Sequence, residues 1–145
     1  MEIVIRDMTE QDKRSVFEMM RAFYSSPAVY TNGSDDIFES DIDNCVNKSP
    51  YLEGYVFADS NGLKGYAMVA KSFSTEFGKP CIWIEDLYIK NEYRGCGIGK
   101  LFLNFITKKY ENCIFRLEVE KENEIAVKLY EKSGFSVLPY MEMKK

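Results

Sequence analysis

Two adjacent carboxylates stand inside an otherwise apolar stretch and are the first residues that could do chemistry. Glu85 and Asp86 interrupt residues 82–89, whose other members are apolar or aromatic. Successive strand residues face opposite sides, so both acids can face outward only if the strand is irregular. A carboxylate inside a central strand is costly unless it is paired or wetted by a cleft. The pattern favours a site lined by one or both acids, and an edge strand with solvated acids is the alternative.

A glycine cluster is the second feature, since three of the nine glycines, Gly95, Gly97 and Gly99, fall within five residues. The cluster separates an apolar strand from an amphipathic helix. Glycines let the backbone approach a ligand closely, and a helix N-terminus presents unpaired N–H groups and a positive dipole end. Arg94 and Lys100 add positive charge. The cluster suits a pyrophosphate or another anion, and a glycine-rich turn without a ligand is the alternative.

Two common nucleotide-binding motifs do not fit this cluster. A Walker P-loop would need glycine where Arg94 stands and Ser or Thr where Leu101 stands. A Rossmann fingerprint would need its last glycine where Lys100 stands. The pattern Q/R-x-x-G-x-G/A, in contrast, is satisfied by Arg94, Gly97 and Gly99.

The composition limits which groups can move protons. The chain has 145 residues and no histidine, which excludes His-based triads and His-dependent zinc sites. Acid–base chemistry must therefore come from carboxylates, tyrosines, thiols, lysines, the backbone or water. The net charge of −4 and the pI of about 5.0 argue against nucleic acid as the main partner. A cationic small molecule or a basic peptide fits better.

The cysteines and the hydropathy point to a reduced, cytoplasmic protein. Cys45, Cys81, Cys96 and Cys113 form no C-x-x-C pair, so we expect neither a metal site nor a redox motif. The first residues carry early acids and no long apolar run, so we expect no signal peptide. No stretch approaches the roughly 18 apolar residues that cross a membrane, so no membrane partner is expected.

The elements that must position these residues can be read from hydrophobic periodicity, and one domain over residues 1–145 is expected. A strand over residues 2–6 precedes a helix with Val16, Met19, Met20 and Phe23 on one face. A second helix is predicted over residues 34–47, with Ile37, Ile42 and Val46 facing inward.

A β-rich middle and an alternating second half follow. Residues 51–59 and 63–73 flank Asn61-Gly62, a strong hairpin signal. The remaining predicted elements are a strand at 81–90, a helix from the glycine cluster to about 110, a strand at 113–119, a helix at 123–133, and one or two closing strands at 135–143. The order predicts a mixed sheet with helices on its faces.

These motifs together resemble the GNAT N-acetyltransferase superfamily. The resemblance rests on residues 93–99, on the strand before them, and on Asn123, Tyr130 and Gly134-Phe135, and it covers about residues 72–138. It implies a single-domain α/β (α+β) fold whose mixed, mostly antiparallel central sheet has helices on both faces. It also implies acetyl-CoA as cosubstrate and a homodimer as the family's expected assembly.

The resemblance assigns the cofactor contacts residue by residue. The pyrophosphate of acetyl-CoA is expected on loop amides, and the pantetheine along the main chain of the preceding strand. Asn123, a predicted helix cap, is expected to contact the cofactor as well, although capping alone would explain it. The expected set is Leu87, Tyr88, Ile89, Arg94, Gly95, Cys96, Gly97, Ile98, Gly99, Lys100 and Asn123.

Acetylation of an amine requires removal of a proton, because an alkyl amine with a pKa near 10 is protonated at pH 7. Without histidine, a carboxylate or a water chain must do this, and Glu85 is the expected general base, acting directly or through water. Asp86 and Tyr24 are expected to contact the substrate. The amine attacks the thioester directly, with a strand amide near Leu87 stabilising the oxyanion.

The resemblance makes Tyr130 the proton donor to the leaving thiolate. Its place among apolar residues would equally suit packing in the core. Cys96 offers an alternative covalent route through an acetyl-cysteine, but no base is evident near it.

The substrate class follows from a narrower resemblance. Residues 73–75, Gly78 and residues 84–89 look most like diamine and thialysine acetyltransferases, which act on cationic amines. The segment at 24–33, which would close over the substrate, does not match that pattern. We therefore expect a primary amine of a small, polyamine- or lysine-like substrate. Acetylation of proteins or peptides, and a non-catalytic acyl-CoA sensor, are the alternatives.

Overall fold

A single five-stranded sheet forms the centre of the molecule. The computed structural model describes residues 2–145. The strands are β1 (Val4–Asp7), β2 (Leu52–Asp59), β3 (Gly62–Ser74), β4 (Lys79–Ile89) and β5 (Ile114–Leu117), arranged in that order. Neighbouring strands from β1 to β4 are antiparallel, while β4 and β5 are parallel. The predicted mixed, mostly antiparallel sheet is confirmed.

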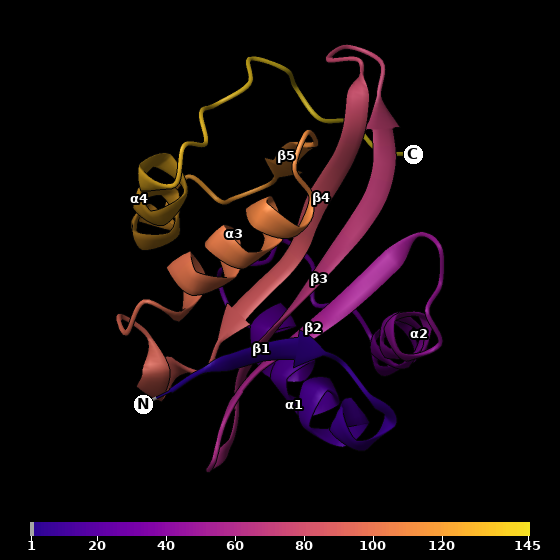
Figure 1. Cartoon of the computed structure of the whole chain (residues 1–145), viewed down its shortest axis with the longest axis vertical. Helices are drawn as coiled ribbons and strands as arrows, with labels where there is room; N and C mark the ends of the chain where they lie inside the picture. Colours follow the sequence, from indigo (N-terminus) through magenta and orange to yellow (C-terminus); the bar gives the residue numbers. More distant parts are fainter. Residues whose placement is uncertain (1) are drawn as a thin grey trace.

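Helices cover both faces of this sheet (Figure 1). They are α1 (Lys13–Tyr24), α2 (Asp35–Val46), α3 (Ile98–Lys109) and α4 (Glu124–Lys132), with single 3₁₀ turns at Glu10–Asp12 and Asn91–Tyr93. Apolar side chains of α1 and α2 pack with Val56, Tyr66 and Met68 on one face. Those of α3 and α4 pack with Phe57 and Val69 on the other. Among the helices of residues 2–145, none is long and apolar enough to cross a membrane.

The β2–β3 hairpin confirms the Asn-Gly signal. Asp59 pairs with Gly62, and the Asn61 N–H donates to Asp59 Oδ1 at 2.8 Å. Asp59 thus closes the turn with its own side chain, as turn-forming Asp residues often do. The hairpin fixes the register of β3 against β2. β3 in turn pairs with β4 from one end of β4 to the other.

The inward face of α2 differs from the prediction. Phe38, Ile42 and Cys45 are buried, whereas Ile37 is 53% exposed and Val46 lies only at the edge of the core. The buried positions are spaced i, i+4 and i+7, which is one helical face. The prediction chose Ile37 as the first residue of this face, but the larger Phe38 fills it and packs edge-on against Phe17 (6.2 Å between ring centroids).

The predicted closing strands at 135–143 are wrong, because the structure describes these residues and assigns them no strand. Pro139 has no N–H to give to a ladder, which interrupts pairing at the middle of the segment. After α4 the chain bends back toward the β3–β4 turn (Figure 1), where the Tyr140 hydroxyl donates to Glu76 at 2.6 Å.

Candidate active site

The loop before α3 has the conformation that its glycines allow. Gly95 and Gly97 have φ angles of +78° and +84°, a region that favours glycine, and a Cβ at either position would meet no atom within 4 Å. The first bond of α3 runs from the Leu101 N–H to the Gly97 carbonyl at 3.0 Å. The preceding amides at the start of the helix are therefore left for a ligand or for water. The loop thus offers an open backbone at a helix N-terminus.

Gly99 has a different role from the other two glycines. A Cβ there would lie 2.9 Å from Leu129 Cδ2, so this glycine lets α3 approach α4 closely. Ile98, one residue earlier, is buried at 3% exposure and anchors the start of α3 in the core. Cys96 and Lys100 are exposed on the loop and on the first helical turn.

Arg94 folds back onto the end of β4. Its Nε donates to the Ile89 carbonyl at 2.8 Å, and its guanidinium carbon lies 5.6 Å from the centre of the Tyr88 ring. Nη1 also reaches Asn91 Oδ1 at 3.3 Å. The arginine therefore ties the glycine loop to the strand before it, and it leaves the adjoining loop backbone uncovered.

The strands β4 and β5 separate halfway along β4. Their pairing covers only Cys81 to Ile84, while β4 stays paired with β3 as far as Ile89. Within residues 2–145, the β5-facing edge of residues 85–89 therefore has no strand partner. Leu87, Tyr88 and Ile89, predicted to lie along the pantetheine, are in this segment. An extended group can add to such an edge through main-chain hydrogen bonds.

A bulge lies at the acidic pair, although only Glu85 faces outward and Asp86 is buried. Ile84 pairs with Val69 and Asp86 pairs with Met68, so Glu85 is an extra residue in β4. One inserted residue reverses which face the later side chains occupy. Ile84 packs on the α3 side and Tyr88 on the α1 side, although the two are four residues apart.

Asp86 is buried at 3% exposure on the α1 side. The Tyr24 hydroxyl donates to Oδ1 and the Tyr66 hydroxyl donates to Oδ2, both at 2.7 Å. Burial raises the pKa of Asp86, while the two hydrogen bonds act to lower it. Burial beside the Asp86 charge in turn raises the pKa of Tyr24, so its proton stays on the hydroxyl. Tyr24 and Asp86, both predicted to contact the substrate, thus contact each other.

Glu85 lies open to solvent beside this buried carboxylate. Partial desolvation and the charge of Asp86 raise the pKa of Glu85, and the charges of Glu142 and Asp41 add to the effect. A carboxylate with a raised pKa is a stronger base than an ordinary glutamate once it is ionised.

Further carboxylates gather near the pair. Burial, and then the charge of Asp86, raises the pKa of Asp41 to about 6. Hydrogen bonding with Glu142, together with burial, raises the pKa of Glu118 to about 7. None of the ion pairs among residues 2–145 involves Asp41, Glu85, Asp86, Glu118 or Glu142. These acids are therefore not neutralised by any ion pair within the described residues.

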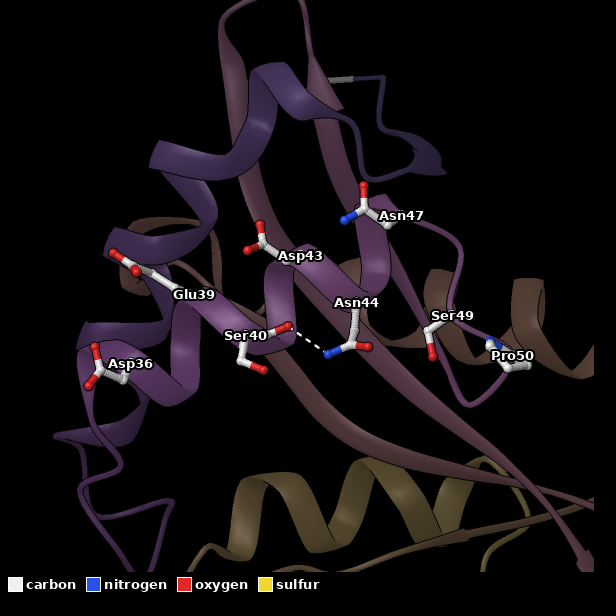
Figure 2. A pocket seen from close by; sticks show the side chains of 8 residues that line it. All are labelled: Asp36, Glu39, Ser40, Asp43, Asn44, Asn47, Ser49 and Pro50. Atoms are coloured by element: carbon white, nitrogen blue, oxygen red, sulfur yellow. Dashed lines mark hydrogen bonds between the residues drawn. The ribbon is translucent and has the colours of Figure 1, made fainter.

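The other acids of α2 lie elsewhere: Asp35, Asp36, Glu39 and Asp43 are on its outer part. Asp35 pairs with Arg21 at 2.8 Å and Asp43 pairs with Lys13 at 2.7 Å. The outer face of α2 borders an open groove of about 590 Å³, shown in Figure 2, which holds none of the predicted site residues. It is lined by Asp36, Glu39, Ser40, Asp43, Asn44, Asn47, Ser49 and Pro50. Among the acids of this helix, Asp41 is the one whose pKa the charge of Asp86 raises.

Tyr130 lies on α4, partly buried against Phe135 with 5.8 Å between ring centroids. Burial raises its pKa to about 12, so the hydroxyl keeps its proton at neutral pH. No hydrogen bond of this hydroxyl is found within residues 2–145, so its proton is free for a ligand or water. Asn123 caps the same helix, accepting from the Ala126 N–H at 3.3 Å. Packing and capping, the two structural alternatives, are therefore both present.

Sequence reasoning missed Tyr66, Glu118 and Glu142. Asp41 belongs to an acidic run over residues 35–43, a pattern that suits a cationic substrate but is more often a solvated helix face. Residues 64–69 of β3 are all buried, so the burial pattern itself does not select Tyr66, and only strand geometry places Tyr66 and Met68 together on the α1 side. Glu118 and Glu142 gave none, because they come from just after β5 and from the C-terminal segment, and only the tertiary fold brings them near Glu85.

Comparisons with known proteins agree with the motifs. A family model for the acetyltransferase (GNAT) family matches residues 14–135. A thialysine N-epsilon-acetyltransferase from Sus scrofa is 28% identical and aligned over 91% of this chain and 83% of its own length.

Solved structures show the same fold. A possible acetyltransferase from Clostridium difficile 630 superposes with a TM-score of 0.82 at 22% identity, over 99% of this chain and 96% of its own. AAC(6')-Iy, solved with the bisubstrate analogue CoA-S-monomethyl-acetylneamine, gives 0.80 at 14% identity, over 100% of this chain and 98% of its own. The chain belongs to the GNAT acetyltransferase family and is an N-acetyltransferase.

Proposed function

We propose that the chain transfers an acetyl group from acetyl-CoA to a primary amine of a small cationic compound, of the polyamine or lysine-analogue class. The observation that carries the proposal is the uncompensated acidic region around Glu85 and Asp86. Five carboxylates, none of which forms an ion pair within residues 2–145, lie close enough to raise one another's pKa, and a positively charged ligand would relieve that repulsion. The similarity to a thialysine acetyltransferase supports the same substrate class, since thialysine carries a side-chain amine.

The residues near the glycine loop fit acetyl-CoA. Gly95 and Gly97 have no side chain and border open space, so their backbone is accessible to a pyrophosphate. The amides from Gly95 to Lys100 would hold that group, and Arg94 fixes the loop that carries them. The open edge of Leu87, Tyr88 and Ile89 would hold the pantetheine arm, with Asn123 at the start of α4 as a further contact. When bound, acetyl-CoA supplies the acetyl group as a reactive thioester and leaves as a thiol.

Glu85 would remove the proton that the substrate ammonium carries, directly or through one water. Its side chain is exposed, so an amine can approach it, and its raised pKa brings its basicity closer to that of the amine. The freed lone pair then attacks the acetyl carbonyl, forming the C–N bond as the C–S bond breaks. A β4 amide near Leu87 would stabilise the negative charge on the carbonyl oxygen.

Tyr130 would supply the proton for the departing sulfur. Its hydroxyl stays protonated at neutral pH and has no partner within residues 2–145, so the proton is available without breaking an internal hydrogen bond. The nitrogen loses two protons in all: the first passes to Glu85 before the attack, and the second leaves once the C–N bond has formed and restores the proton that Tyr130 gave to the thiol. One proton is released to solvent in the net reaction, and this is the proton that Glu85 took up.

A thiol-release assay tests the proposal. The purified protein is given acetyl-CoA and, in turn, polyamines, lysine analogues, aminoglycosides and peptides. We expect turnover on a polyamine or lysine analogue, with the product N-acetylated on a primary amine by mass spectrometry. Turnover on peptides alone would replace the proposal with protein acetylation. Tight acetyl-CoA binding without turnover on any amine would favour an acyl-CoA sensor.

A further inference from the structure

We propose that Tyr66, in the middle of β3, is a positioning residue for proton removal: together with Tyr24 it holds the Asp86 carboxylate fixed and ionised behind Glu85. The inference rests on the proposed function only in taking Glu85 as the base. Its first part, the state of Asp86, can be tested without any substrate.

Each oxygen of the Asp86 carboxylate accepts one hydrogen bond from a tyrosine hydroxyl. Tyr24 donates to Oδ1 and Tyr66 donates to Oδ2, each at 2.7 Å. No lysine or arginine forms an ion pair with Asp86 within residues 2–145. A buried carboxylate without a cation depends on such donors to stay ionised, because hydrogen bonds to the charged form favour that form. The two tyrosine hydroxyls therefore stabilise the charged form of Asp86, as a neighbouring cation does for other buried carboxylates.

The fold holds the Tyr66 hydroxyl in place. Tyr66 is fully buried, and its ring packs between Phe23 of α1 and Tyr88 of β4, with ring centroids 6.5 and 6.0 Å away. In the ladder, Tyr66 pairs with Tyr88 and Met68 pairs with Asp86. The bulge at Glu85 turns Asp86 onto the same face as Tyr66. Without that extra residue, Asp86 would lie on the α3 side, away from both tyrosines.

The groups facing Asp86 from other elements are acids or neutral hydroxyls and thiols. Tyr24 comes from α1, Tyr66 from β3, and Asp41 and Cys45 from α2, while Glu85 adjoins it on β4. None of these neighbouring groups carries a positive charge. Only the two phenolic hydroxyls favour its ionised form, so removal of either one raises its proton affinity.

The pKa of Glu85 depends on whether Asp86 is ionised, so a change in the protonation of Asp86 can be measured at Glu85. It faces the charges of Asp86, Glu142 and Asp41, with Glu118 nearby, and all of them disfavour its ionised form. If Asp86 becomes neutral, one of these repulsions disappears and the pKa of Glu85 falls. Activity requires ionised Glu85, so the acid limb of the kcat/KM profile moves to lower pH. A merely structural loss would lower the profile without moving this limb.

The first test observes Asp86 directly in the protein without ligands. Carbon-13 NMR of protein labelled at the aspartate carboxyl carbons follows its titration, with the resonance assigned from Asp86→Asn. Tyr66→Phe should raise the proton affinity of Asp86 by about ten- to a hundredfold, since a hydrogen bond to a charged group is lost. Tyr24→Phe should act in the same direction. Tyr110→Phe removes a hydroxyl that donates to Glu53 at 2.6 Å, and it should leave Asp86 unchanged.

The second test is kinetic and uses the best amine from the thiol-release assay. Tyr66→Phe and Asp86→Asn should both move the acid limb of kcat/KM to lower pH, and Tyr66→Phe should add no further shift in the Asp86→Asn background. An unchanged Asp86 titration in folded Tyr66→Phe and Tyr24→Phe proteins would overturn the inference. Absence of turnover by the unmodified protein would instead overturn the proposed function, and the NMR result would still decide the state of Asp86.

Discussion

Gly99 and Leu129 bring α3 and α4 into close contact, since a Cβ at position 99 would lie 2.9 Å from Leu129 Cδ2. Leu129 is the neighbour of Tyr130, so the helix that starts at the glycine loop also supports the helix that carries the proposed proton donor. The third glycine of the cluster therefore connects the glycine loop to the helix of the proposed proton donor through packing.

Gly99→Ala should destabilise the protein modestly and slow turnover. The added methyl displaces the end of a flexible leucine side chain, so a cost of about 1 kcal/mol is expected, which lowers Tm by about 2–4 °C. Thermal unfolding and kcat measure the two effects. Leu129→Ala creates space for the methyl, so the double variant should lose less stability than the sum of the single variants. Strict additivity would show that the two residues are not coupled.

Glu85→Gln should lower kcat/KM by about 10²–10⁴ near neutral pH, the usual contribution of a general base. The deficit should shrink as the pH approaches the pKa of the amine, because free amine needs no base. The affinity for acetyl-CoA should be nearly unchanged. A pH profile of kcat/KM and a binding titration measure these effects. Asp36→Asn removes the same charge from the groove on the outer face of α2 (Figure 2) and serves as the control. Unaltered kinetics in Glu85→Gln would remove this residue from the mechanism.

The sequence indicated the irregularity at Glu85 but not its consequence. Strict alternation puts Glu85 and Asp86 on opposite faces, so the sequence made an irregular strand the condition for both acids to face outward. The strand is irregular, but the bulge leaves Glu85 exposed and Asp86 buried. Which acid is buried depends on the register between β3 and β4, and the hydrogen bond from Tyr66 joins residues 20 positions apart. Single-sequence periodicity contains no information on that register.

Sequence motifs of a few residues correctly predicted the turns and loops. Asn61-Gly62 predicted the β2–β3 hairpin, and the glycine cluster predicted a strand-to-helix loop, because turn geometry depends on a few neighbouring residues. The segment at 135–143 was misread, because alternating apolar residues indicate a strand only when an edge is available to pair with it. Pro139 and the path of the chain after α4 prevent that pairing in this structure.

Tyr130→Phe should lower kcat by about 10²–10⁴ while Tm stays nearly the same. The substitution keeps the ring that packs on Phe135 and removes a hydroxyl for which no hydrogen-bond partner is found within residues 2–145. Steady-state kinetics and thermal unfolding on the same sample separate the two roles. A loss of stability without a specific loss of rate would assign Tyr130 to packing alone.

Gly97→Val should abolish acetyl-CoA binding. The φ of +84° is strained for any residue with a Cβ, at a cost of about 1–2 kcal/mol, and a valine side chain would occupy the open space beside the loop amides. Gly78→Val is the matched control, since Gly78 has a φ of +64° and open space but lies in the β3–β4 turn. Both variants should lose similar stability, and only Gly97→Val should lose binding in a calorimetric titration with acetyl-CoA. Both variants strain a backbone with positive φ, and only position 97 lies at the start of α3. Equal affinity of the two variants for acetyl-CoA would therefore mean that the pyrophosphate does not bind at this loop.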